Sequence, residues 1–218
     1  MPFVIPAIDP NADYKALVKE AYDTCAAAYD ASRKTEPGTE MRELLSRLDD
    51  GDTVLDIGCG AGVPIARSLA ARYRVTGVDI SPEIIQRAQE NVPAGEFVCA
   101  DIMSATFPPS SFDAVVAFYS VFHLPRQEHA ELFRRIQQWL KPGGYLLCTL
   151  SHYSEDGYTE DDFFGVTMYW SNYSLSEYAE ILNGVGFTLL ETDSTGSGYD
   201  EAIQEVSENH PLVLARKH

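Results

Sequence analysis

Two acidic residues and a glycine-rich loop are the parts of this sequence whose types and spacing most directly suggest chemistry. Asp79 closes the apolar run 74–79, and Asp101 follows the run 96–100. Upstream, residues 56–62 read Asp-Ile-Gly-Cys-Gly-Ala-Gly, in which the glycines let a ligand come close to the backbone. One carboxylate can accept hydrogen bonds from both hydroxyls of a ribose, and a second can accept from the amino group of an adenine. Together these features predict a site for an adenosine-containing ligand.

The spacing of the glycines helps to separate two kinds of ligand. A dinucleotide fingerprint reads Gly-x-Gly-x-x-Gly and directs a helix N-terminus at a pyrophosphate, whereas residue 63 here is Val. A dinucleotide also needs the first acid but has less use for the second. The pattern therefore favours a methyl donor, and a nicotinamide cofactor stays open as an alternative.

These residues must be positioned by a sheet. From residue 53 onward, apolar runs rich in β-branched residues alternate with segments of helical period, which is typical of βα units on a parallel sheet. We expect strands at 53–57, 74–79, 96–100, 112–118, 145–150, 187–192 and 212–215. We expect helices at about 14–30, 40–48, 64–70, 82–91, 127–140 and 175–183, with residues 141–144 as a turn. In such a sheet, ligands bind beyond the carboxyl ends of the strands, where the glycine loop and both acids fall.

Residues 151–173 are expected to form a long irregular segment rich in aromatic side chains. Long ordered loops are more often binding elements than plain connections. We therefore expect this segment to contribute to a ligand pocket, although packing of its rings against one another is nearly as plausible.

Several motifs, taken together, carry a resemblance to a known family. They are residues 54–62, 78–81, 100–101, 112–116 and 140–144, in the family's order and at ordinary spacings. The chain resembles the class I S-adenosylmethionine-dependent methyltransferases, of the type that acts on small metabolites. The resemblance implies a Rossmann-like α/β fold with helices on both faces of a seven-stranded sheet, in the order 3-2-1-4-5-7-6 with strand 7 antiparallel. It also implies S-adenosyl-L-methionine as cofactor, S-adenosyl-L-homocysteine as product, and transfer of a methyl group to O, N, S or C of the acceptor.

The residues expected to bind the cofactor lie at the strand ends and on the first helix. Ile80 and Ile102 would contact the adenine ring, and Tyr29 or Arg33 would meet the methionine carboxylate. The full expected set is Tyr29, Arg33, Gly58, Cys59, Gly60, Asp79, Ile80, Asp101, Ile102 and Phe118. Residues 1–50 are expected to form a helical lid or extension, and 51–218 the methyltransferase domain.

Methyl transfer from a sulfonium is an in-line displacement, for which an enzyme supplies proximity, alignment and exclusion of water. A base helps only if the acceptor is a protonated oxygen or nitrogen, and the candidates are Tyr119, His123 and His152. His123 could instead orient a helix or the cofactor. The acceptor pocket is expected to be lined by Tyr22, Tyr153, Tyr169 and Trp170.

The amino-acid composition argues against several classes of binding partner. Asp and Glu outnumber Lys and Arg by 33 to 16, and the resulting charge of −17 disfavours nucleic acid, anionic membranes and polyanionic acceptors. No apolar run approaches the roughly 20 residues that span a bilayer, so a cytoplasmic monomer or homodimer with a small-molecule acceptor is expected. The four cysteines include no Cys-x-x-Cys pair, so neither a metal nor a disulfide is expected. Cys99 and Cys148 are predicted to be core residues.

A rival from another functional class is also open. A protein that binds S-adenosylmethionine without transferring its methyl group would share these motifs and the fold, because a fold does not fix a function.

Overall fold

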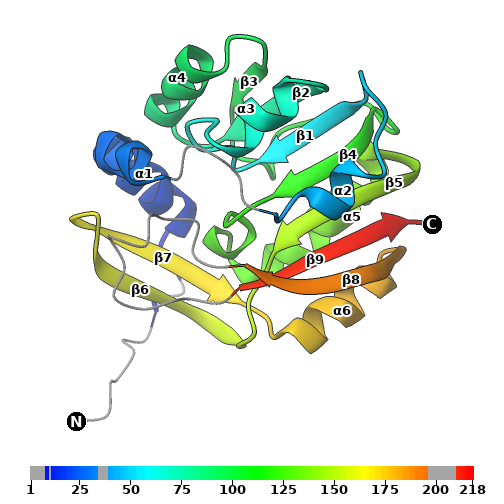
Figure 1. Ribbon diagram of the computed structural model, residues 1–218. Helices are drawn as coiled ribbons and strands as arrows, with labels where there is room; N and C mark the ends of the chain where they lie inside the picture. Colours follow the sequence, from blue (N-terminus) through cyan, green and yellow to red (C-terminus); the bar gives the residue numbers. More distant parts are fainter. Residues whose placement is uncertain (1–7, 10, 34–38, 196–209) are drawn as a thin grey trace.

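A seven-stranded sheet forms the centre of the structure, a computed structural model that describes residues 8–9, 11–33, 39–195 and 210–218. The strand order is β3-β2-β1-β4-β5-β9-β8 (Figure 1). Strands β1 to β5 pair in parallel, and β9 runs antiparallel to both β5 and β8. Since β8 and β9 are the sixth and seventh strands of this sheet along the chain, the predicted fold class and strand order are confirmed.

The elements alternate along the chain as the sequence pattern predicts. The strands of the sheet are β1 (Thr53–Ile57), β2 (Arg74–Asp79), β3 (Glu96–Cys99), β4 (Phe112–Ala117), β5 (Leu140–Thr149), β8 (Phe187–Thr195) and β9 (His210–Lys217). The helices are α1 (Tyr14–Ser32), α2 (Arg42–Leu45), α3 (Ile65–Ala70), α4 (Pro82–Asn91), α5 (His129–Trp139) and α6 (Leu175–Gly184), with short 3-10 turns η1 (Val121–His123) and η2 (Arg126–Glu128).

Both faces of the sheet are buried. Neighbouring residues of β1 and β4 point into different clusters, so that Leu55 and Val115 join one core while Val54 and Val116 join the other. The first cluster includes side chains of α5 and α6, and the second includes side chains of α2 and α3. This double burial explains why the strands read as nearly continuous apolar runs.

Local signals fix where several helices begin. The Ser81 hydroxyl accepts from the Ile84 amide at 3.2 Å, and Pro82 occupies the first helical position of α4. Ser174 and Glu177 form a reciprocal capping box at the start of α6. Both helix starts agree with the sequence prediction.

The prediction of an irregular segment at 151–173 is wrong. These residues contain an antiparallel hairpin of β6 (Glu155–Phe163) and β7 (Val166–Asn172), which lies beside α1 and apart from the large sheet (Figure 1). The carboxylates along β6 interrupt the alternation of apolar and polar residues that predicts a strand. The outer strand of a hairpin does not need that alternation, because both of its faces can be polar. The inner strand β7 packs against α1, where Met168 and Tyr169 meet Val18 and Ala21.

Three smaller expectations also need correction. Residues 141–144 lie within β5, which begins at Leu140 and shifts register against β4, rather than forming a turn before it. The helix expected over 40–48 is reduced to the four residues of α2. Cys99 is exposed because β3 is an edge strand, whereas Cys148 is buried as predicted.

Candidate active site

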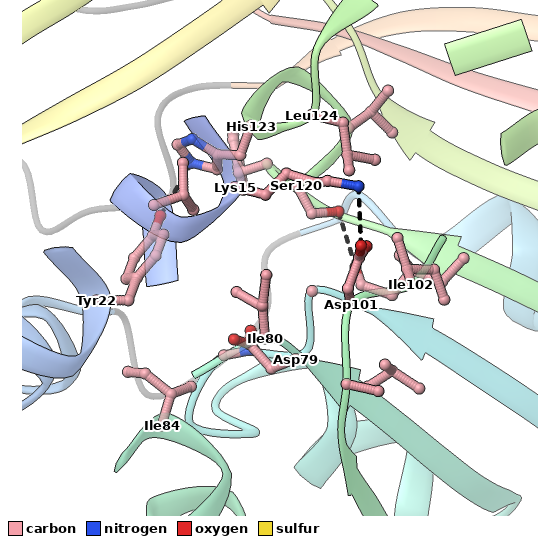
Figure 2. A pocket seen from close by; sticks show the side chains of 18 of the residues that line it. Lys15, Tyr22, Asp79, Ile80, Ile84, Asp101, Ile102, Ser120, His123 and Leu124 are labelled. Atoms are coloured by element: carbon pink, nitrogen blue, oxygen red, sulfur yellow. Dashed lines mark hydrogen bonds and ion pairs between the residues drawn. The ribbon is translucent and has the colours of Figure 1, made fainter. Parts of the chain in front are cut away.

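A cavity opens at the carboxyl ends of β1 to β4, with about 750 Å³ of space between its atoms that includes open solvent at its mouth. Helix α1 contributes to its wall. Figure 2 shows side chains from α1, β2 and the segments after β3 and β4 converging on this space. Of the residues expected from the sequence, the cavity wall includes Tyr22, Tyr29, Gly58, Gly60, Asp79, Ile80, Asp101, Ile102, Phe118, Tyr119 and His123.

The glycine loop packs closely against the chain that follows β4. Gly58 has φ +65°, and a Cβ placed there would lie 2.3 Å from the Cβ of Ser120. The Ser120 hydroxyl in turn donates to the Ile57 carbonyl at 2.7 Å. Glycine at position 58 is therefore required both by its backbone conformation and by its neighbour.

Asp79 is held by backbone amides on both of its oxygens. Oδ2 accepts from the Gly60 amide at 3.1 Å and Oδ1 from the Ser81 amide at 3.0 Å, so the carboxylate bridges the glycine loop and the start of α4. Burial raises the pKa of Asp79 to about 6, against the lowering effect of these amides. A carboxylate offers about four lone-pair sites, which leaves acceptor capacity for a ligand in the cavity.

Asp101 is paired with a lysine that the sequence analysis missed. Its Oδ1 accepts from the Met103 amide at 2.9 Å, and its Oδ2 lies 2.9 Å from Nζ of Lys15 (Figure 2). Lys15 also pairs with Glu128 at 3.1 Å. Burial disfavours the charged ammonium, but the two carboxylates outweigh it and raise the pKa of Lys15. Lys15 belongs to no motif, so only the docking of α1 could reveal its place.

His123 and Tyr22 form a hydrogen-bonded pair in the cavity wall. The Tyr22 hydroxyl lies 3.0 Å from Nε2 of His123 (Figure 2). Nδ1 of His123 lies 2.9 Å from the Tyr169 carbonyl. A carbonyl only accepts, so Nδ1 carries the hydrogen and Nε2 accepts from Tyr22. Burial lowers the pKa of His123 to about 4, which keeps the ring neutral near pH 7.

A smaller cavity adjoins the glycine loop and contains a buried acid. Asp56 is 2% exposed, and its Oδ2 has no hydrogen-bond partner among the described residues. Burial, and then the neighbouring charge of Asp79, raise the pKa of Asp56 to about 7. Arg33 and Cys59 also line this space, with the Arg33 guanidinium 5.7 Å from the centre of the Tyr29 ring. The sequence analysis did not single out Asp56, although it begins the glycine motif.

Four expected residues do not line either cavity. His152 and Tyr153 are exposed, Tyr153 by 75%, because the chain turns away into β6 directly after β5. The ring of Tyr169 is buried and stacks on the ring of Tyr14, with 4.1 Å between ring centres. Tyr169 therefore contacts the site through its backbone carbonyl, which accepts a hydrogen bond from His123. Trp170 stacks on Tyr158 and lies behind His123, with ring centres 5.7 Å apart.

Residues 54–144 match a family model described as a methyltransferase domain, and this segment contains the glycine loop and both strand-end acids. A phosphoethanolamine N-methyltransferase of Triticum aestivum is 32% identical over 193 residues, which are 83% of this chain and 37% of that protein. The chain belongs to the class I S-adenosylmethionine-dependent methyltransferases. The cofactor expected from the sequence is thus the cofactor of its family.

Further comparisons agree with this methyltransferase assignment. A phosphoethanolamine N-methyltransferase of Plasmodium falciparum is 32% identical over 174 residues, covering 75% of this chain and 64% of that protein. The chain therefore spans 37% and 64% of the length of these two relatives.

The fold is shared with a solved structure of Burkholderia thailandensis 1,6-didemethyltoxoflavin-N1-methyltransferase, which contains 1,6-didemethyltoxoflavin and S-adenosylhomocysteine. Its TM-score is 0.71 at 20% identity, and the match covers 99% of this chain and 93% of that one. In the part of this chain that the structure describes, no helix is both long and apolar enough to cross a membrane.

Proposed function

We propose that this protein transfers a methyl group from S-adenosylmethionine to a small-molecule acceptor, with both bound in the cavity beyond β1 to β4. One observation carries the proposal: Asp79 and Asp101, at the ends of the adjacent strands β2 and β3, are held by backbone amides and face one cavity beside the glycine loop. Such a pair suits the ribose diol and the adenine amino group of one nucleoside.

The remaining residues fit the other parts of the donor. Ile80 and Ile102 line the cavity on either side of these acids and supply apolar contact for the adenine. The buried Oδ2 of Asp56 has no hydrogen-bond partner among the described residues, which suits the donor's ammonium group. Arg33 in the same small cavity suits the donor's carboxylate. When bound, S-adenosylmethionine supplies a methyl group already activated on a sulfonium.

The chain's own contribution to the reaction is positioning and the exclusion of water. Helix α1 packs on α4 and β7 and brings Lys15, Tyr22 and Tyr29 into the cavity wall. We assign residues 1–50 as a lid or extension of the methyltransferase domain of residues 51–218, with α1 as the part that borders the cavity. The Tyr22 hydroxyl, which donates to neutral His123, would orient the acceptor and receive a hydrogen bond from it.

A turnover assay tests this function. The purified chain is incubated with S-adenosylmethionine carrying a deuterated methyl group and a panel of metabolites, and S-adenosylhomocysteine and labelled product are measured by mass spectrometry. We expect acceptor-dependent release of S-adenosylhomocysteine, lost in the Asp79→Asn variant. Binding of S-adenosylhomocysteine without turnover of any acceptor would favour a non-transferring role. Thermal stabilisation by NADH and not by S-adenosylhomocysteine would favour an oxidoreductase.

A further inference from the structure

Carboxylates outnumber positively charged side chains around the cavity. Among the described residues of its wall, Lys15 and His123 are the basic ones, and Asp79 and Asp101 are the acidic ones. The ammonium of Lys15 lies between Asp101 and Glu128, and the buried imidazole of His123 is neutral, with both nitrogens in hydrogen bonds. An anionic group that binds in this cavity would lose favourable hydration. Among the described residues of the wall, it would not meet a positively charged side chain that is not already paired.

The hairpin beside α1 adds to this imbalance. Residues 151–173 contain five acidic residues and neither Lys nor Arg. The nearby Arg126 is already committed, since its guanidinium pairs with Asp156, donates to Ser154 and lies 4.9 Å from the centre of the Tyr173 ring. These carboxylates do not line the cavity, and together with the net charge of −17 they favour neutral or cationic ligands over anions at long range.

The hydrogen-bonded pair in the wall is poorly suited to removing a proton from an alcohol. Behind His123 lies the Tyr169 carbonyl, not a carboxylate, so a protonated imidazole would be buried without a counter-ion. A residue that acts as a general base must be stabilised by its surroundings after it takes up the proton. The Tyr22 and His123 pair is better suited to orienting an acceptor that already has an available lone pair.

From these features we infer that the acceptor is a nitrogen base, an amine or a nitrogen heterocycle, that carries no phosphate or carboxylate group. This inference rests on the proposed methyltransferase function and names its substrate class. An amine that is protonated in solution first gives up its proton to water. The lone pair of the neutral nitrogen then forms the N–C bond while the S–C bond breaks, and the electron pair of the S–C bond stays on sulfur, so the sulfonium becomes a neutral thioether. The positive charge passes to nitrogen, and any proton on it then leaves to water.

Aromatic rings at the wall fit the cation formed in this step. Tyr22 and Tyr29 line the cavity, and their rings meet edge to face at 5.1 Å between centres. Phe163, which does not line the cavity, meets Tyr22 edge to face at 6.0 Å. Aromatic faces attract ammonium groups, most strongly where water is excluded. Among the described residues, the cavity wall thus offers aromatic contact for a methylated nitrogen, and its one lysine is already paired with carboxylates.

Matched acceptors test the inference on the unaltered chain. Ethanolamine, tyramine and histamine represent nitrogen bases. Phosphoethanolamine, O-phosphotyramine, tyrosine and histidine add an anionic group to the same frames, and tyrosol keeps the phenol and an alcohol but has no nitrogen. We expect kcat/KM to be at least tenfold higher for a nitrogen base than for its anionic partner, with the label located on nitrogen by fragmentation. Faster turnover of the anionic partners or of tyrosol would overturn the inference.

Two further readouts complete the test. In Tyr22→Phe, kcat/KM for the best nitrogen base should fall less than about 100-fold, below the range typical of lost general acid–base catalysis, and a larger fall confined to kcat would contradict a purely orienting role. If S-adenosylhomocysteine binds but no nitrogen base is methylated, the inference fails while the donor site stands. If S-adenosylhomocysteine does not bind, the proposed function itself fails.

Discussion

Replacing Asp56 by asparagine is expected to stabilise the ligand-free protein and to weaken donor binding. The carboxyl is 2% exposed, and burial raises its pKa from 3.8 to about 7. That is a change of about 3 pKa units, and at about 1.4 kcal/mol per unit the ionised carboxylate costs the folded state about 4 kcal/mol. Asparagine keeps the shape of the side chain and cannot ionise, so this cost should disappear.

The direction of the pKa shift of Asp56 determines how the free energy of unfolding depends on pH. Between about pH 4 and pH 7 the folded protein binds a proton at Asp56 more tightly than the unfolded chain does, so wild-type stability contributed by this group falls as pH rises through that window. Below pH 4 the group is protonated in both states and the difference from Asp56→Asn should vanish. Above pH 7 it should reach its full value.

Urea unfolding followed by circular dichroism at pH 4.5, 6 and 8 measures this difference. The exposed Asp50 is a matched control, and Asp50→Asn should change the free energy of unfolding by less than about 0.5 kcal/mol at each pH. A gain in Asp56→Asn that is the same at pH 4.5 and pH 8, or a loss of stability at pH 8, would refute the reasoning about the buried charge.

Two other variants test how the site is built. Lys15→Met keeps most of the side-chain length but removes the ion pair with Asp101, so S-adenosylhomocysteine binding measured by calorimetry should weaken by about 1 kcal/mol, roughly fivefold, and unchanged affinity would contradict this role for α1. Gly58→Ala forces a Cβ to 2.3 Å from that of Ser120 at φ +65°, whereas Gly165→Ala has φ +82° and nothing within 4 Å of its Cβ. Thermal unfolding should show a loss of about 1 kcal/mol for Gly165→Ala and at least 2 kcal/mol for Gly58→Ala, and equal losses would contradict the close packing of the loop.

The central sheet could be predicted because its signals are local. Asp79 and Asp101 follow short apolar runs, and parallel strands deliver their carboxyl ends to one edge, so their convergence needed no knowledge of side-chain packing. The caps at Ser81 and Ser174 act within one turn of their helices, so the predicted starts of α4 and α6 also depend on local sequence.

What the sequence did not disclose depends on contacts between distant segments. Lys15 reaches Asp101 across 86 residues, and Tyr22 reaches His123 across 101, through the docking of α1. The hairpin was missed because the carboxylates on β6 interrupt the usual alternation. The position of Tyr153 outside the site follows from that hairpin, which carries the chain away from the sheet edge.

The most direct test of the donor site is calorimetric titration of the purified protein with S-adenosylhomocysteine, for the wild type, Asp79→Asn and the exposed control Asp50→Asn. Loss of charge-assisted hydrogen bonds from Asp79 to the ribose should cost about 1.5 to 3 kcal/mol, or roughly 10- to 150-fold in affinity. We predict saturable binding to the wild type and the control, and this loss in Asp79→Asn. No binding to the wild type, or equal affinity in Asp79→Asn, would contradict the assignment of the cavity.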